Sequence, residues 1–376
     1  MKRILSVALV ILFSLAEKTI LALPVSDDKP KKIKAKSVKK IMEKVANWQL
    51  KTWEEKGSKH RWYDWTNAAG YTGLFALSNI SRNKKYIETL IAKGDTLNWE
   101  TGPRRFHADD YCIGQTFSLL YAKYKDEKMI TNFRRLADSI VAAPHTESLE
   151  WKNNITNREW AWCDALFMGP TALSYLSTVT GEQKYFDVAV KLWWKTTDYL
   201  YDSTEHLYSR DGSYLNKKEK NGAKVFWSRG NGWVFGGLVR MLDNMPENYP
   251  DRKRFISLYK DMAAKVTSIQ QPDGSWHASL LDPVSYPIKE MSGTGFYCYG
   301  LMWGINNKLL DKETYWPVVE KAWNELISSV HEDGMLGYVQ PIGAAPDKVD
   351  ANSTEIYGVG SFLLAGSEIY KYLKHN

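Results

Sequence analysis

The chain has 376 residues, of which 44% are apolar and 25% are charged, so it can bury a large core and lacks the composition of a disordered protein. The formal net charge is +7, but much of the positive charge lies in the first 40 residues, which leaves the remainder close to neutral. A nucleic-acid-binding protein needs basic side chains clustered on one face, so this class is not expected.

The N-terminus has the pattern of an export signal. A short basic start, MKR, precedes an apolar run from Ile4 to Ala16, which has the length of a signal-peptide core and is too short to span a membrane as a helix. We expect a signal peptide over residues 1–22, cleaved at Ala16 or Ala22, and an exported protein, periplasmic or secreted, with no membrane span in the mature chain. An uncleaved membrane anchor is the alternative.

Residues 23–40 are expected to form a charged, solvated lead-in, because the segment DDKPKKIKAKSVKK has almost no large apolar side chains. No Pro-, Gly- or Ser-rich linker interrupts residues 41–376. We therefore expect one domain over this range.

Six glycines open apolar helical stretches along this domain. They are Gly70, Gly114, Gly169, Gly232, Gly295 and Gly360. Most of these stretches are followed by a turn and a second, more charged helix, such as KKYIETLIAK. Apolar residues recur at three- and four-residue steps within the helices. The repeat predicts six helical hairpins in an all-α chain.

The spacing between the glycines varies, whereas open helical solenoids keep a nearly fixed repeat. The extra residues fall mainly before the glycines, in long loops rich in Trp, Tyr, Asn and charged residues. Loops of this kind usually shape a binding site. We therefore expect the hairpins to close into an (α/α)6 barrel of six inner and six outer helices, with a pocket at one end.

The cysteines and histidines do not indicate a metal site or a cofactor. The 3 cysteines fit no zinc-binding spacing, and the 7 histidines form no HxH or HExxH pair. We expect buried thiols; one disulfide between two of the three is the alternative in an exported protein.

Polar and aromatic residues gather at the entrances of the predicted inner helices. Asp109 and Asp164 stand at the same offset before their glycines, so the repeat places the two carboxylates at equivalent corners of neighbouring units. Carboxylates among aromatic side chains are the groups that cleave and hold sugars. A glycan substrate is therefore predicted, although an aspartate at a helix entrance also often caps the helix.

Five segments together resemble the unsaturated rhamnogalacturonyl hydrolases of glycoside hydrolase family 105, relatives of the unsaturated glucuronyl hydrolases. They are HADDYCIGQ, WAWCDALFMGP, FWSRGNGW, SGTGFYCYG and EIYGVGSFLLAGSEIY, and the resemblance runs from about Trp48 to Tyr370. The resemblance implies an (α/α)6 barrel, in agreement with the repeat. It also implies a glycosidase that hydrates the C4=C5 double bond of the 4,5-unsaturated uronic acid at the non-reducing end of lyase-generated oligosaccharides, here unsaturated rhamnogalacturonyl disaccharides from pectin.

The same resemblance implies roles for individual residues. Asp164 is expected to protonate C4 and to activate the water that adds at C5, with Asp109 as its neighbouring carboxylate. This role needs a raised pKa for Asp164, which burial among aromatic side chains supplies. Arg229 is expected to pair with the uronate carboxylate. The full set of expected substrate contacts is Trp162, Arg229, Trp233, Asn67, His107 and Glu355, of which Asn67 and Glu355 are chosen for their positions at helix entrances and not from the resemblance.

One segment departs from the family pattern. In HLYSRDGSYL, Arg210 and Asp211 stand where some rhamnogalacturonan enzymes carry a histidine. An unsaturated glucuronyl hydrolase acting on ulvan-type or other uronate glycans therefore stays open. An inverting glycosidase, a sugar epimerase and a non-catalytic glycan-binding toroid also stay open, and the sequence does not indicate an oligomeric state.

Overall fold

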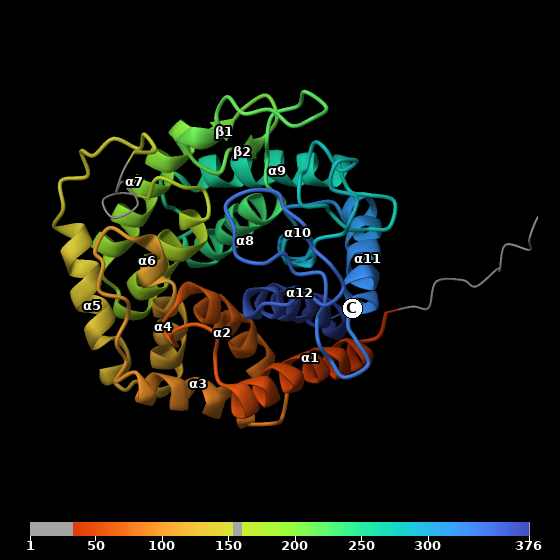
Figure 1. Cartoon of the computed structure of the whole chain (residues 1–376). Helices are drawn as coiled ribbons and strands as arrows, with labels where there is room; N and C mark the ends of the chain where they lie inside the picture. The colour runs from red at the N-terminus through yellow and green to blue at the C-terminus, as the bar shows by residue number, and fades with distance from the viewer. Residues whose placement is uncertain (1–32, 153–159, 376) are drawn as a thin grey trace, which may run out of the picture. The chain divides into compact units, whose positions relative to one another are not determined.

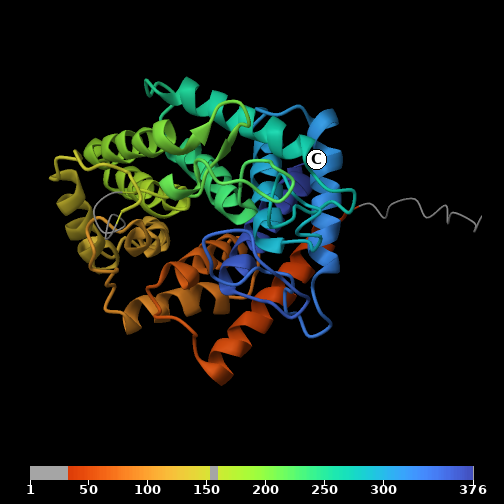
Figure 2. The same cartoon turned by 45° about the horizontal axis from the view of Figure 1, so that its top comes forward.

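The computed structural model describes residues 33–152 and 160–375. The expected signal peptide lies outside the described residues. Among the described residues, six helices form an inner ring and six more surround it (Figures 1 and 2). The expected all-α (α/α)6 barrel is confirmed.

The inner helices are buried on nearly all sides. In α10, for example, every residue from Met291 to Ile305 is buried. Each inner helix contains one of the six repeat glycines near its start. The inner helices are α2 (Trp65–Ser78), α4 (Ile113–Tyr124), α6 (Ala165–Thr180), α8 (Ser228–Asn244), α10 (Met291–Asn306) and α12 (Ile356–His375).

The outer helices are amphipathic, and each buries one stripe against the inner ring. In α5 the buried residues recur at helical spacing, including Ile130, Phe133, Ala137 and Ile140. The remaining face of such a helix carries charged side chains in water. The outer helices are α1 (Ala35–Lys56), α3 (Lys85–Thr96), α5 (Lys128–Val141), α7 (Gln183–Leu200), α9 (Arg252–Ser268) and α11 (Lys312–Ser328).

The ring is closed by helices from opposite ends of the described chain. Each of the first five inner helices is followed by its outer partner, but α12 contacts α1 as its outer neighbour and α2 as its inner neighbour (Figure 1). The expected six consecutive hairpins are therefore five hairpins and one pair made from α1 and α12. Helix α1 begins at Ala35, inside the expected lead-in, because Val38 and Met42 already belong to its buried stripe.

Glycines let the inner helices α12 and α2 approach one another closely at the seam of the ring. A Cβ at Gly360 in α12 would lie 2.5 Å from the carbonyl oxygen of Ala69 in α2, and a Cβ at Gly73 would lie 2.5 Å from the carbonyl oxygen of Gly360. No side chain fits at such distances. Gly360 and Gly73 are thus required by the close contact of α12 with α2 at the seam of the ring.

The segments between helices contain little regular structure. Strands β1 (Tyr201–Asp202) and β2 (Leu207–Tyr208) form an antiparallel pair, and the described parts of the loops contain the short 3-10 helices η1 (Ala108–Tyr111) and η3 (Gly212–Tyr214). The three cysteines, all among the described residues, are buried and unpaired. Within the described ranges, no helix is both long and apolar enough to cross a membrane.

Candidate active site

A cavity of about 210 Å³ lies where the inner helices begin. Four of its ten lining residues are Trp or Met, and four are charged. The lining residues are Trp65, Asp109, Trp162, Asp164, Met168, Arg210, Trp227, Arg229, Ile342 and Gly343. Backbone N–H groups at helix N-termini carry a partial positive charge, so the helices that begin here favour an anionic ligand.

The two expected catalytic carboxyl groups face this cavity together. Asp109 lies in η1, which leads into α4, and Asp164 is the residue that precedes α6. Their side chains are 20% and 14% exposed. Both remain open to the cavity, although little of either reaches bulk water. The equivalent offset seen in the sequence thus corresponds to neighbouring positions in space.

The electrostatic surroundings of the two carboxyl groups differ. Burial raises the pKa of Asp109 to about 8, and the negative charge of Asp164 adds to this increase. Burial also raises the pKa of Asp164, but the positive charges of Arg210 and Arg229 act in the opposite direction. The negative charge of Asp164 thus favours the protonated form of Asp109, and the two cations favour the ionised form of Asp164.

Arg210 is a cavity residue that the sequence did not place in the site. Its Nε lies 3.9 Å from Oδ2 of Asp164. Its Nη1 donates to Oδ2 of the buried Asp211 at 2.6 Å, which fixes the guanidinium. The only sequence signal was the departure from the family pattern at these two positions.

Arg229 is buried and firmly held. Its Nη1 donates to the carbonyl oxygens of Gln340 and Pro341 and to the hydroxyl of Tyr357, the last two at 3.0 Å. The guanidinium carbon lies 4.3 Å from the ring centre of Trp227 and 4.9 Å from that of Tyr357. Nε and Nη2 have no hydrogen-bond partner in the part of the chain that the structure describes, so the edge that suits a carboxylate is unused.

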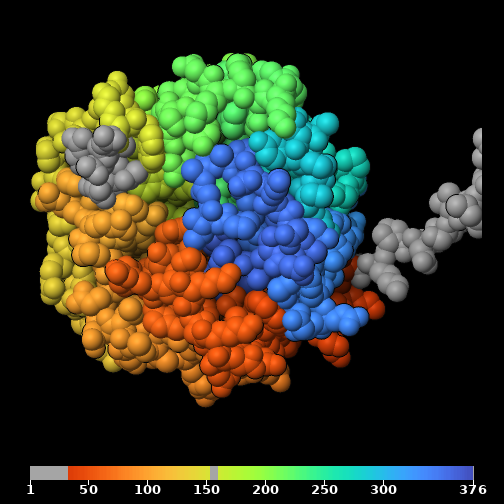
Figure 3. Space-filling view, in the orientation of Figure 1, coloured from red at the N-terminus to blue at the C-terminus, as the bar shows by residue number. Residues whose placement is uncertain are grey.

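The segment between α11 and α12 forms one wall of the cavity. It crosses the face shown in Figures 1 and 3, where it is blue. Gln340 anchors it, because its amide oxygen accepts from Nε1 of Trp227 at 2.9 Å and its backbone N–H donates to Oε1 of Glu290 at 3.1 Å. Beyond this anchor, the side chain of Ile342 is 49% exposed at the cavity.

Two of the expected substrate contacts lie at or just behind the cavity wall. Trp162 lines the cavity, and the ring of His107 lies 5.3 Å from it. Nδ1 of His107 is 3.7 Å from Oδ2 of Asp109. Burial and the charge of Arg104 lower the pKa of His107 to about 4, so this imidazole is neutral near pH 7 and is not a counter-ion for Asp109.

Trp233 lies beneath the cavity and does not line it. Its side chain is fully buried, and its ring meets that of Trp65 edge to face at 5.9 Å. Trp233 therefore supports a lining residue. The RGNGW motif lies on an inner helix, as predicted, but Trp233 is on the side of α8 that faces the core.

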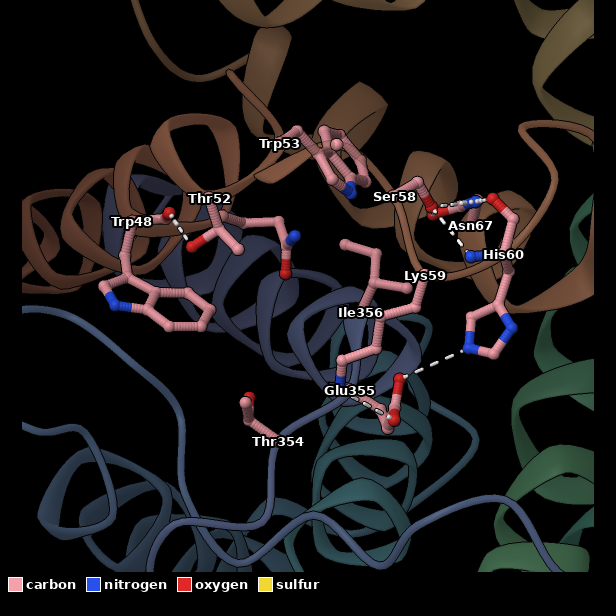
Figure 4. A pocket seen from close by; sticks show the side chains of 12 residues that line it. Trp48, Thr52, Trp53, Ser58, Lys59, His60, Asn67, Thr354, Glu355 and Ile356 are labelled. Atoms are coloured by element: carbon pink, nitrogen blue, oxygen red, sulfur yellow. Dashed lines mark hydrogen bonds and ion pairs between the residues drawn. The ribbon is translucent and has the colours of Figure 1, made fainter. Parts of the chain in front are cut away.

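Asn67 and Glu355 line a separate, smaller pocket (Figure 4). The amide of Asn67 donates to Oγ of Ser58 at 2.8 Å, which holds the loop before α2. Glu355 pairs with Nζ of Lys59 at 3.2 Å and lies 3.7 Å from Nε2 of His60. Both positions are at helix entrances, as expected, but neither residue lines the cavity that holds the two aspartates.

The sequence profile of Glycosyl Hydrolase Family 88 matches residues 36–373. A protein of Formosa agariphila named unsaturated 3S-rhamnoglycuronyl hydrolase is 40% identical over 321 residues, which are 82% of this chain and 84% of that protein. A protein of the same name from an Alteromonas species is 33% identical, covering 89% of this chain and 86% of that protein.

Solved structures agree with these matches. A glycosyl hydrolase family 88 protein from Bacteroides vulgatus superposes with a TM-score of 0.81 at 30% identity. The superposition covers 90% of this chain and all of that one. The similarity therefore extends over most of the chain.

Proposed function

This chain belongs to Glycosyl Hydrolase Family 88, and from that premise we propose that it removes a 4,5-unsaturated uronic acid from the non-reducing end of oligosaccharides produced by a polysaccharide lyase. The observation that carries the proposal is the carboxyl pair of Asp109 and Asp164 in a cavity lined with tryptophan. An oligosaccharide with an unsaturated uronate is thus the substrate class.

The pair supplies the two proton transfers that hydration of a vinyl ether needs. A proton held by the pair is delivered to C4, and C5 becomes electron-poor because the ring oxygen stabilises positive charge there. Water bonds to C5 as its proton passes to the carboxylate of Asp164, which restores the proton of the pair. We assign the step at C5 to Asp164 because Arg210 and Arg229 favour its ionised form.

The product of hydration is a hemiketal at C5. When the bond between C5 and the ring oxygen breaks, C5 becomes a ketone and the ring oxygen becomes a hydroxyl on C1. C1 then carries this hydroxyl and the glycosidic oxygen, so it expels the remaining saccharide as an alcohol and becomes an aldehyde. No covalent bond between sugar and protein is required.

The uronate carboxylate finds complementary charge in this cavity. Arg210 and Arg229 both line it, and the unused Nε and Nη2 of Arg229 form the edge that binds a carboxylate through two parallel bonds. Both of these nitrogens are buried.

We propose a sulfated rhamnose as the sugar that follows the uronate. Two relatives carry names that specify a 3S-rhamnoglycuronyl substrate, at 40% and 33% identity. Arg210 also occupies the position at which this chain departs from rhamnogalacturonan enzymes. The proposal thus favours ulvan-type oligosaccharides over the pectic disaccharides expected from the sequence.

We further propose that the protein is exported. The apolar run from Ile4 to Ala16 after a basic start supports this proposal. Cell fractionation with an antibody to the chain tests it: recovery of the full-length protein in the cytoplasm would contradict export.

The test of the activity is the ultraviolet absorbance of the C4=C5 bond conjugated with the uronate carboxylate. Ulvan-lyase digests should lose this absorbance on addition of the protein, whereas a lyase would increase it. Asp164→Asn should abolish the loss with an unchanged circular dichroism spectrum, and Asp187→Asn, a change on the exposed face of α7, is the matched control. Absorbance that persists in ulvan, pectic and glycosaminoglycan digests alike rejects the proposal.

A further inference from the structure

A groove of about 590 Å³ lies beside the cavity and is lined by two loops, one before α2 and one before η1. Three of its seven lining residues are cationic and one is acidic. The lining residues are Lys59, His60, Arg61, Tyr63, Asp64, Pro103 and Arg104. Such a lining attracts an anion.

The groove and the cavity are lined by neighbouring residues of the same two segments of the chain. Asp64 lines the groove and caps α2, and the next residue, Trp65, lines the cavity. Arg104 lines the groove and binds Asp110 through Nε at 3.0 Å and Nη2 at 2.6 Å, while the adjacent Asp109 lines the cavity. Two neighbouring residues of an oligosaccharide can therefore occupy the cavity and the groove.

The three cations keep donors for a further anion. Arg61 donates from Nη1 to the hydroxyl of Tyr63 at 2.7 Å and forms no ion pair with a carboxylate of the described residues. Arg104 uses Nε and Nη2 for Asp110, which leaves Nη1. Lys59 pairs with a single oxygen of Glu355, and its side chain is 68% exposed. Each of these cations can therefore contact an anion without losing its present partner.

We infer that this groove binds the sulfate of the sugar next to the unsaturated uronate, with Arg61 as the principal contact and Lys59 and Arg104 beside it. The inference rests on the proposed function. A sulfate ester is ionised at every pH that the protein tolerates, and guanidinium groups bind such oxyanions with charge-assisted hydrogen bonds. The position of the groove beside Asp109 favours a group on the sugar adjacent to the scissile bond.

Another anion of the same substrate is the carboxylate of a uronate further along a longer chain. A disaccharide lacks this second uronate, so disaccharides separate the two sources. We compare the unsaturated uronyl-rhamnose 3-sulfate disaccharide with its chemically desulfated form, and a sulfated tetrasaccharide serves as the third substrate.

The measured quantity is the ratio of kcat/KM for the sulfated disaccharide to that for the desulfated one. The wild-type ratio should be about tenfold, since a charge-assisted contact contributes roughly 1.4 kcal/mol. Arg61→Gln and Lys59→Gln should each lower the ratio by about two- to fivefold, mainly through KM, as expected for partly exposed ion pairs. Added salt should lower the wild-type ratio in the same direction. Arg82→Gln, an exposed arginine outside the groove, is the matched control.

The outcomes separate this inference from the proposed function. If both disaccharides are hydrolysed with equal kcat/KM and the groove variants do not change the ratio, the sulfate site is rejected while the activity stands. If the groove variants affect only the tetrasaccharide, the cations bind the second uronate and the inference is again wrong. If no substrate loses its absorbance, the proposed function fails and the inference fails with it.

Discussion

The carboxyl group of Asp164 interacts with both Asp109 and Arg210. Its negative charge raises the pKa of Asp109, whereas the positive charge of Arg210 lowers the pKa of Asp164 itself. Burial raises the pKa of Asp109 to about 8, and the negative charge of Asp164 adds to the increase. Arg210, with its Nε 3.9 Å from Oδ2 of Asp164, opposes the effect of burial on the pKa of Asp164. The two aspartates therefore have different electrostatic surroundings although they share one cavity.

Asp109→Asn should reduce activity and stabilise the fold at high pH. The pKa of Asp109 is about 8 in the folded protein and 3.8 in its unperturbed state. Between these values the folded state binds the extra proton, so the free energy of unfolding falls as pH rises through this window. The Asp109→Asn variant has no titrating group at this position, so its stability does not fall in this way. The melting temperature of the variant minus that of the wild type should therefore be higher at pH 8 than at pH 4.5, by about 2 °C or more. A difference that is the same at both pH values would contradict the raised pKa.

Arg210→Met should move the acid limb of the pH profile of kcat/KM to higher pH. The cation lowers the pKa of Asp164, so its removal raises this pKa, and a larger part of the enzyme carries a protonated Asp164 at a given acidic pH. Arg210→Lys keeps the charge and should keep the limb near its wild-type position. A limb that stays in place in both variants would show that Arg210 does not tune Asp164.

Arg229→Lys should lower both stability and activity. The lysine cannot reproduce the contacts of Nη1 with Gln340, Pro341 and Tyr357, so the cavity wall loses its anchor. We expect kcat/KM to fall by about 100-fold, as when a positioned group is displaced by about 1 Å. Tyr357→Phe removes a single contact of Arg229 and should have a smaller effect on both quantities. If Tyr357→Phe lowers kcat/KM and the melting temperature as much as Arg229→Lys does, the contacts of Arg229 with Gln340 and Pro341 do not hold the cavity wall.

Gly360→Val should destabilise the ring at its seam. The new side chain would meet the backbone of Ala69 and Gly70, and overpacking of a core costs about 1–3 kcal/mol or more. The expected result is a lower melting temperature or no soluble protein. Gly343→Ala, where the nearest atom is 3.8 Å from an added Cβ, is the stability control and should melt near the wild-type temperature.

The inner ring could be predicted from sequence because its six helices share one physical requirement. Each must be apolar on nearly all sides and must approach its neighbours closely, so glycines recur at the contacts. Helix α1 has an ordinary amphipathic pattern without such a glycine, and nothing in that pattern connects it with α12. Which distant helices pair depends on closure of the ring, and the pattern of residues within one helix does not indicate its distant partner.

The candidate site was predicted in part for similar reasons. Asp109 and Asp164 occupy equivalent places in the repeat, so their shared location could be read from the offset. Position at a helix entrance does not fix the direction of a side chain, and Asn67 and Glu355 accordingly face another pocket. Ile342 comes from a long loop whose path is set by the tertiary bonds of Gln340, which have no sequence signature.

The pairing of α1 with α12 has a consequence for biosynthesis. A ribosome delivers α1 first and α12 last, so five hairpins emerge before the ring has its final member. Tyr357, which lies on α12 and holds Arg229, reaches its place only then. A nascent chain stalled before this helix thus already contains Asp109, Asp164 and the wall residues Gln340 and Ile342, but it lacks the hydroxyl of Tyr357 that accepts from Nη1 of Arg229; the site is complete only when the last helix has been made.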